Sequence, residues 1–272
     1  MVAQGKIGEA GFHFSKALGT NQDSAEVQHS IGVVLVGQGK PQEAVPYFES
    51  ALWMKQDRPD SHNYLGVISF NQGKSREAIA HFTEALRIDP AYQEAYRHLG
   101  TALLQEGRDE EAIRSFAEAL RIDPRDEKAH NNLGVALGRQ GKIPEAMSHY
   151  MEALKINPYS VDALCNLGDT LSLQGKTQEA ISHYTQALRI RPQDAEVRSR
   201  LGILFAQQGK NQEAVQYLSG ALRADPGNAK AHFALGLVFL GMGKKDLALK
   251  EYEILKAINP HLSNMLQQKI NP

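Results

Sequence analysis

The chain has 272 residues, of which 42% are hydrophobic and 22% charged, and its 30 Lys and Arg residues nearly balance 31 Asp and Glu residues for a net charge of −1. The hydrophobic content is too high for a disordered chain, and the balanced charge argues against a dedicated nucleic-acid-binding protein, which shows a basic excess or stripe. A single cysteine, Cys165, excludes internal disulfides and a cysteine-based zinc site.

The sequence shows neither a membrane span nor a signal peptide. No stretch approaches the roughly 18 uninterrupted apolar residues of a membrane-spanning helix. No basic segment is followed by the apolar core of a signal peptide. We therefore expect a soluble, cytoplasmic protein with no direct membrane insertion.

A glycine followed by a basic residue recurs with a period of 34 residues, and the chain length is eight such periods. The dipeptides are Gly5-Lys6, Gly39-Lys40, Gly73-Lys74, Gly107-Arg108, Gly141-Lys142, Gly175-Lys176, Gly209-Lys210 and Gly243-Lys244. A fixed period of this size predicts a stacked array of repeats rather than one globular core.

The repeats are numbered here so that this turn glycine has repeat position 15. The sequence then predicts a single array over residues 1–272, because no Pro-, Gly- or Ser-rich linker interrupts the period. The array comprises a partial repeat at 1–24, full repeats at 25–58, 59–92, 93–126, 127–160, 161–194, 195–228 and 229–262, and a capping tail at 263–272.

Each full repeat predicts two helices. Helix A covers about positions 1–14, with apolar residues at positions 3, 7, 10 and 11, and the glycine at position 15 ends it as a left-handed C-cap. Helix B begins near position 17 and ends at an Asp-Pro or Asn-Pro pair such as Asp89-Pro90. The two helices of each repeat are therefore joined by a tight turn.

Three positions of the repeat hold the same kind of residue in almost every repeat, small at two of them and large at the third. Position 8 is glycine in all seven full repeats, position 20 is alanine throughout, and position 24 is aromatic in every repeat except at Leu218. A glycine inside a helix costs about 1 kcal/mol relative to alanine. Its recurrence therefore predicts a close approach of neighbouring helices, with a large side chain received by the small ones.

The two ends of the array differ from its middle. Repeat 25–58 carries Pro46 inside its second helix, where we expect a kink or a loosened helix. Residues 262–270 place Leu262, Met265, Leu266 and Ile270 at helical spacing, which predicts a short amphipathic helix that covers the last repeat.

The N-terminus begins in the middle of a repeat, so that Phe12 and Phe14 belong to a second helix with almost no first helix before it. We expect either that the chain is part of a longer protein or that its first helix is degenerate. An uncapped end would expose apolar surface and favour self-association.

The period of 34, Leu-Gly at positions 7 and 8, Ala at 20, Phe or Tyr at 24 and Pro at 32 resemble the tetratricopeptide repeat (TPR), in a bacterial-type array. The segment 95–124 is a good example. This resemblance implies an all-α fold, a right-handed superhelical α-solenoid of stacked antiparallel helix pairs. It also implies that helix A lines a concave groove through positions 2, 5, 6, 9, 12 and 13.

These inner positions vary far more than the packing columns, as expected of a recognition surface on a uniform frame. Drift on a solvated face is the plainer explanation for any single position. The candidate groove residues are Asn63, Tyr64, Phe70, Arg97, His98, Thr101, Lys128, Asn131, Asn132, Asn166, Asp169, Arg200 and Phe233. We expect the asparagines and the basic residues to contact peptide backbone or carboxylates, and the aromatic residues to form apolar pockets.

No pattern of catalysis or metal binding emerges. Gly73-Lys74-Ser75 and Gly175-Lys176-Thr177 lack the earlier glycine of a phosphate-binding loop and are interpreted as turns. Among the ten histidines, His62, His130 and His232 share repeat position 4, and His81, His149 and His183 share position 23. The histidines are interpreted as filler or surface residues. Cys165 has no partner base and is interpreted as a plain small side chain. We therefore expect no catalytic residue, no metal site and no cofactor.

The leading hypothesis is a non-enzymatic scaffold that holds a peptide or helix of a partner protein in its groove. One alternative is the regulatory or targeting arm of a larger enzyme, such as a glycosyltransferase, or of a membrane-associated assembly protein. Another is a module for homotypic assembly through the N-terminal end. The sequence does not identify the partner.

Overall fold

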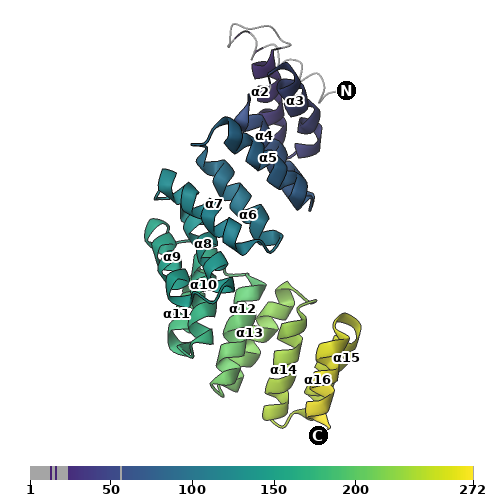
Figure 1. Cartoon of the computed structure of the whole chain (residues 1–272). Helices are drawn as coiled ribbons and strands as arrows, with labels where there is room; N and C mark the ends of the chain where they lie inside the picture. The colour runs from purple at the N-terminus through teal and green to yellow at the C-terminus, as the bar shows by residue number, and fades with distance from the viewer. Residues whose placement is uncertain (1–12, 14–15, 17–23, 56, 272) are drawn as a thin grey trace. The chain divides into compact units, whose positions relative to one another are not determined.

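The structure is a computed structural model that describes residues 13, 16, 24–55 and 57–271. Between residues 25 and 270 it contains fifteen α-helices, and no described residue lies in a β-strand (Figure 1). The predicted all-α fold is confirmed. The chain divides into two compact units, Met1–His149 and Tyr150–Pro272, and the helix α9 (Ile143–Ile156) contains the boundary between them.

The first helix of each repeat, the A helix, has 13 residues throughout. The A helices are α2 (Ala25–Gly37), α4 (Pro59–Asn71), α6 (Gln93–Gln105), α8 (Glu127–Arg139), α10 (Val161–Leu173), α12 (Ala195–Gln207) and α14 (Ala229–Gly241).

The second helix, the B helix, has 14 residues throughout. The B helices are α3 (Pro41–Met54), α5 (Ser75–Ile88), α7 (Asp109–Ile122), α9, α11 (Thr177–Ile190), α13 (Asn211–Ala224) and α15 (Lys245–Ile258), and α16 (Pro260–Ile270) follows the last of them.

The helices pack in chain order within each unit. An A helix contacts the B helix of its own repeat, and that B helix contacts the next A helix, as α4, α5 and α6 do. Successive A helices also touch directly, as α12 and α14 do. Each unit is therefore a stack of helix pairs in which the A helices form one layer.

The turn between A and B helices has the predicted left-handed form. Glycine at repeat position 15 has φ between 71° and 77° in all seven turns. In the second full repeat, the N–H of Gly73 donates to the carbonyl of Phe70 at 2.9 Å and that of Lys74 to the carbonyl of Ser69 at 3.0 Å. These bonds satisfy carbonyls that the end of α4 leaves open.

The glycine at position 8 makes room for the large side chain at position 24 of the same repeat. A Cβ added to Gly66 would lie 2.5 Å from the Phe82 ring, and one added to Gly202 would lie 2.6 Å from Leu218. In the last repeat, Gly236 instead faces Leu266 of α16 at 2.6 Å. The predicted close approach of helices A and B is confirmed, and α16 supplies the large residue at the C-terminal end.

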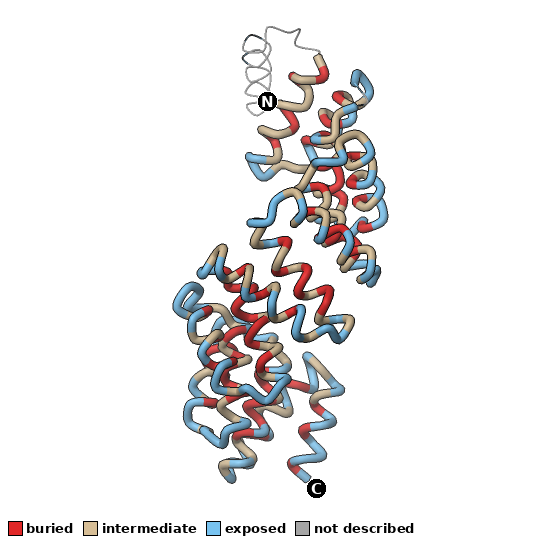
Figure 2. Tube along the Cα trace, turned by 60° about the vertical axis from the view of Figure 1, so that its left-hand side comes forward, coloured by how far each residue is buried: buried red, intermediate tan, exposed pale blue. Residues whose placement is uncertain are grey.

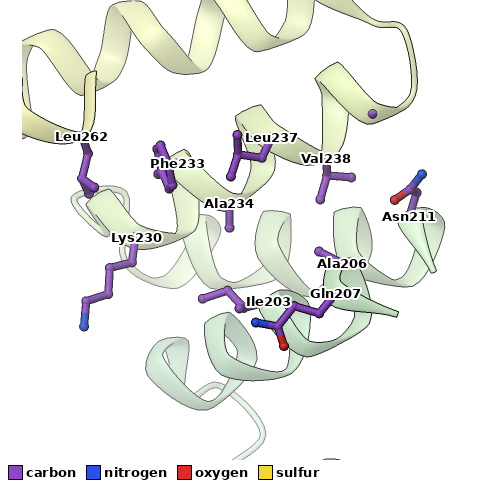
Figure 3. Close-up of a pocket in the computed structure, with 11 residues that line it drawn as sticks. Ile203, Ala206, Gln207, Asn211, Lys230, Phe233, Ala234, Leu237, Val238 and Leu262 are labelled. Carbon is purple, nitrogen blue, oxygen red and sulfur yellow. The ribbon is translucent and has the colours of Figure 1, made fainter. Parts of the chain in front are cut away.

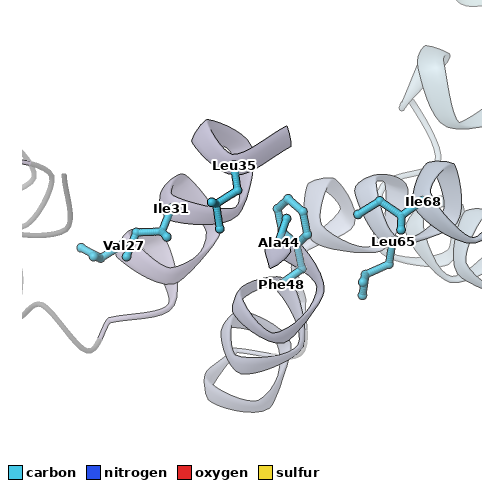
Figure 4. Packing of buried hydrophobic residues seen from close by; sticks show 7 residues of the cluster. All are labelled: Val27, Ile31, Leu35, Ala44, Phe48, Leu65 and Ile68. Carbon is cyan, nitrogen blue, oxygen red and sulfur yellow. The ribbon is translucent and has the colours of Figure 1, made fainter. Parts of the chain in front are cut away.

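The core of each unit follows from this column packing. Figure 4 shows one cluster, whose buried residues come from three successive helices, namely Val27, Ile31 and Leu35 of α2, Ala44 and Phe48 of α3, and Leu65 and Ile68 of α4. Phe48 at its centre is fully buried and stacks on Tyr64 of α4 with ring centroids 5.0 Å apart. Figure 2 shows buried residues recurring along the helices, with exposed residues at the turns.

Most A helices begin with a side-chain cap that the repeat columns do not reveal. The side chains of Ser24, Asp126, Ser160, Asp194 and Asn228 accept a hydrogen bond from the backbone N–H three residues later. Such caps satisfy one of the open donors at a helix N-terminus. The residue just before repeat position 1 thus defines where helix A starts.

At the ends of the array, helix α3 extends from Pro41 to Met54 with Pro46 inside it, and the expected kink or loosening stays a prediction. Helix α16 begins at Pro260, and Leu266 and Ile270 are buried against α14 and α15, but Met265 is 41% exposed. The predicted amphipathic helix is therefore present, with Met265 less buried than Leu266 and Ile270. Phe12 and Phe14, the predicted open end, lie outside the described residues.

Candidate partner-binding grooves

The second unit carries an apolar groove between α12, α14 and α16, with a volume of about 490 Å³ (Figure 3). Its lining comprises Ile203, Ala206, Gln207, Asn211, Lys230, Phe233, Ala234, Leu237, Val238, Gly241 and Leu262. Phe233, a predicted apolar groove residue, lies in this lining.

Helix α14 positions most of this groove because it is apolar on all sides. Ala231, Leu235 and Val238 are buried in the core cluster that α14 shares with α13. Leu237 lies outside that cluster and is 37% exposed, although leucine is an ordinary core residue. A helix that is apolar all round is normally enclosed. The exposed part of α14 can therefore accept further apolar side chains.

The polar groups of this groove lie mainly at its edges. Lys230 in the first turn of α14 is exposed, and Gln207 and Asn211 flank the turn between α12 and α13 (Figure 3). The lining contains one charged group, which is a cation. The groove can therefore bind apolar side chains and place an acidic group near Lys230.

The first unit carries a more polar groove of about 640 Å³ between the end of α2, the start of α3, and α4 and α6. Its lining comprises Val36, Gly39, Pro41, Asn63, Tyr64, Val67, Ile68, Asn71, Tyr92, Glu94 and His98. Three of these, Asn63, Tyr64 and His98, were candidate groove residues. Tyr92, Glu94 and Asn71 complete its polar surface.

A hydrogen-bonded network fixes the floor of this first groove. Asn63 is buried, its amide Nδ2–H donates to the Tyr92 hydroxyl at 3.3 Å, and its Oδ1 lies 2.9 Å from His98 Nδ1. Burial, with smaller contributions from Arg97 and Lys128, lowers the pKa of His98 to about 4. Neutral His98 therefore donates through Nδ1–H to Asn63 at neutral pH, which aligns α4 with α6.

Several predicted contact residues pair with one another between successive A helices. The Arg97 guanidinium lies 3.1 Å from an Asp126 carboxylate oxygen, with side chains only 19% and 11% exposed, and Gln93 also donates to Asp126. The Asn132 amide donates to the Thr101 hydroxyl at 3.3 Å. These groups join successive A helices, and the contact of Arg97 with a partner carboxylate stays a prediction.

A similar pairing occurs in the second unit. Arg200 Nε lies 3.1 Å from Asp169 Oδ1, and the Tyr184 hydroxyl donates to the same oxygen at 2.5 Å. Burial is the largest cause of a raised pKa of Tyr184, and the bond to Asp169 adds to it. Asp169 and Arg200 therefore hold α10 and α12 together, and the contact of Arg200 with a partner stays a prediction.

The remaining candidates fall into three settings. Asn131 is buried and donates to Asn132 at 3.2 Å, whereas Lys128 is exposed on the first turn of α8. Phe70 packs on the cluster around Phe82 and does not line the groove. Asn132 belongs to the first unit and Asn166 to the second. Asn166 is partly buried on α10.

Leu237 and Ile203, both at repeat position 9, line the apolar groove but were not among the candidate residues. Position 9 is one of the inner positions that the TPR resemblance implies, so the sequence could have indicated both residues. They were not chosen because an apolar residue on an apolar helix looks like a core residue in the sequence. Leu262 of α16 has the last position of its repeat, which is not in the inner set, and gave no such signal.

The residues considered for chemistry lie in packed surroundings. Cys165 is buried, and burial raises the pKa of its thiol to about 11, which disfavours the reactive thiolate. His62 Nδ1 lies 3.3 Å from His81 Nδ1, and His232 Nδ1 lies 2.5 Å from a Glu251 carboxylate oxygen. Repeat positions 4 and 23 therefore face each other across helices A and B, with histidine at position 4 and histidine or glutamate at position 23. Among the described residues no three potential ligands gather into a metal site.

The helices of the described segments are also too short or too polar to cross a lipid bilayer.

Comparison with protein families identifies the kind of repeat. Residues 3–261 match the model of the Cilia and flagella-associated protein 70 C-terminal domain, a TPR domain. The chain belongs to this family. The TPR resemblance of the sequence columns is thereby confirmed over nearly the whole chain. No curated protein matches the chain.

Solved TPR structures share the fold. PilF from Pseudomonas aeruginosa is 22% identical, with a TM-score of 0.70 over 78% of this chain and 97% of its own. Cut9, in the APC/C hetero-tetramer Cut9–Hcn1, is 19% identical, with a TM-score of 0.78 over 96% of this chain and 51% of that chain. YrrB, described as a TPR protein with an unusual peptide-binding site, is 22% identical, with a TM-score of 0.56 over 69% of this chain and 97% of its own.

Proposed function

We propose that this TPR protein is a non-enzymatic scaffold that binds a segment of a partner protein on its A-helix layer. The observation that carries the proposal is the apolar groove of the second unit, where Phe233, Leu237 and Ile203 line a space of about 490 Å³. Burying such surface against a partner is favourable by roughly 25 cal/mol per Å². Exposed leucine in a concave apolar site is typical of a binding surface rather than of a catalytic site.

The residues that line this groove indicate which kind of partner segment it binds. We expect a segment with one or two large aliphatic or aromatic side chains and an acidic residue that reaches Lys230. The TPR neighbours support an interaction role in general, since YrrB has an unusual peptide-binding site. The burial of Cys165 and the raised pKa of its thiol agree with a binding role, because they disfavour a cysteine nucleophile.

Peptide selection with a matched pair of variants tests this proposal. Peptides would be selected from a random phage-displayed library on the intact chain, and their dissociation constants measured by fluorescence polarisation. Leu237→Asp places a charge against the apolar partner surface and should weaken groove-binding peptides by about thirtyfold.

Leu249→Asp is the matched control, because Leu249 is also 37% exposed but lies on α15 and does not line the groove. It should change affinity by no more than about twofold, as expected of a residue away from the contact. If no selected peptide distinguishes the two variants, or if the library yields no binder, the apolar groove is not a binding site.

A further inference from the structure

The groove of the first unit differs from the apolar groove in charge and in aromatic content. Among the described residues, the only charged side chain that lines it is Glu94, whereas the only one that lines the second groove is Lys230. Two tyrosines, Tyr64 and Tyr92, also line it, and Asn71 adds an amide. Two grooves with opposite charge select different side chains.

The electrostatic surroundings of Tyr92 are acidic. Burial is the largest cause of its raised pKa, and the carboxylates of Asp60 and Glu94 raise it further. Asp60 and Glu94 are both exposed at the second position of their helices, α4 and α6. A cation at this place would be attracted by both carboxylates and would leave the tyrosine hydroxyl neutral.

Three basic side chains near this groove are paired with carboxylates, and Lys128, which acts on His98 from α8, lies outside the lining. Arg97 lies 3.1 Å from Asp126 on the side toward α8, and Arg58 lies 3.1 Å from Glu26. Lys40, between the lining residues Gly39 and Pro41, lies 3.4 Å from Glu43. His98 is neutral, because its pKa is lowered to about 4. These pairs leave Glu94 without a lining cation to balance it.

We propose that this groove binds a lysine or arginine side chain of the partner segment, with its alkyl stem along Tyr64 and Val67 and its cationic group at Glu94. An aromatic face attracts a cation, and a long basic side chain packs its methylene groups on apolar surface while its charge stays near water. This inference rests on the proposed function, since it assumes that the A-helix layer binds peptide. It adds the charge that the partner segment must carry.

Charge reversal with a matched control tests the inference on the intact chain. Glu94→Lys is compared with Asp162→Lys, which makes the same kind of reversal at the same repeat position in the second unit, away from this groove. A class of library-selected peptides should lose affinity about tenfold or more with Glu94→Lys and less than about twofold with Asp162→Lys. The thermal unfolding midpoint of each variant checks that the loss is not a folding defect.

A double-mutant cycle then assigns the contact. Replacing the critical Arg or Lys of such a peptide by Met should weaken binding to the original chain by about fivefold, but should change binding to Glu94→Gln far less. Peptide selection repeated on Glu94→Lys should enrich Asp or Glu where the original chain enriches Arg or Lys.

The outcomes separate this inference from the proposed function. If selected peptides depend on Leu237 but none depends on Glu94, or if the Glu94-dependent peptides carry no basic residue, the inference is wrong while the proposed function holds. If neither class of peptide appears, both are wrong. Peptides that depend on Glu94 through a basic residue, but never on Leu237, would support the first groove and contradict the apolar one.

Discussion

His98 shows how a single polar residue can link two repeats and respond to pH. Its pKa is lowered from 6.5 to about 4, chiefly by burial, so the unfolded chain binds more protons than the folded chain between these pH values. The stability that neutral His98 contributes is complete above about pH 6.5 and is lost as the pH falls toward 4. The loss should be of the order of 2 kcal/mol.

The variant His98→Gln isolates this contribution, because glutamine can still donate to Asn63 but does not titrate. We expect the urea unfolding midpoint of the original chain to fall more steeply between pH 6.5 and pH 4.5 than that of His98→Gln. His29, His62 and His81 also have lowered pKa values through burial and remain in both proteins. Parallel pH profiles would show that His98 does not titrate as described.

Gly66 is the second residue-scale case, since its hydrogen atom faces the Phe82 ring. Gly66→Ala puts a Cβ 2.5 Å from that ring and should destabilise the chain by about 1 to 3 kcal/mol through overpacking, despite the better helix propensity of alanine. Gly37→Ala, at the end of α2 with nothing within 4 Å, should be neutral or slightly stabilising. Denaturant unfolding of both variants checks this, and equal effects would contradict the packing argument.

At the scale of the helix, Asp126 performs two tasks. It caps α8 by accepting from the Ala129 N–H at 3.0 Å, and it pairs with Arg97 of α6. Asp126→Ala should therefore cost about 2 to 4 kcal/mol, because it removes the cap and leaves Arg97 partly buried without its carboxylate. Asp126→Asn keeps a good capping side chain and should cost less.

Asp194 supplies the comparison for this helix. It caps α12 through the Val197 N–H at 3.0 Å, and no ion pair of Asp194 occurs within the described segments. Asp194→Ala should cost about 1 kcal/mol, as capping substitutions usually do. Unfolding free energies of the variants would separate the contribution of the cap from that of the ion pair. An Asp126→Ala effect no larger than that of Asp194→Ala would show that the pair with Arg97 contributes nothing.

The sequence predicted contacts inside one repeat better than contacts between successive A helices. The glycine turns and the pairing of Gly66 with Phe82 lie within one repeat, so they recur in every period and are visible as columns. The bond from Arg97 to Asp126 joins α6 to the cap of the next A helix, α8, through residues that do not recur in every period. The columns therefore predicted the fold well, while the candidate site mixed residues that line a groove with residues that join successive A helices.

At the scale of the whole molecule, the 34-residue period continues through two compact units that meet within α9. No composition change marks this boundary, since every repeat uses the same packing columns, and the sequence therefore did not predict it. Each unit presents one groove on its A helices, and the two linings differ in charge. Helix packing that is the same in every repeat, combined with grooves of different charge, suits a scaffold that binds partner segments of different chemistry.

The proposed scaffold function requires partner segments to bind to the A-helix layer. Site-specific photo-crosslinking of a library-selected, Leu237-dependent peptide tests it most directly, with a benzophenone side chain placed at Gln207 or at Gln216. Gln207 is exposed in the lining of the apolar groove, and Gln216 is exposed on α13 outside that lining. We predict a covalent adduct with the peptide from position 207 and none from position 216. Crosslinking from position 216 alone would contradict this claim.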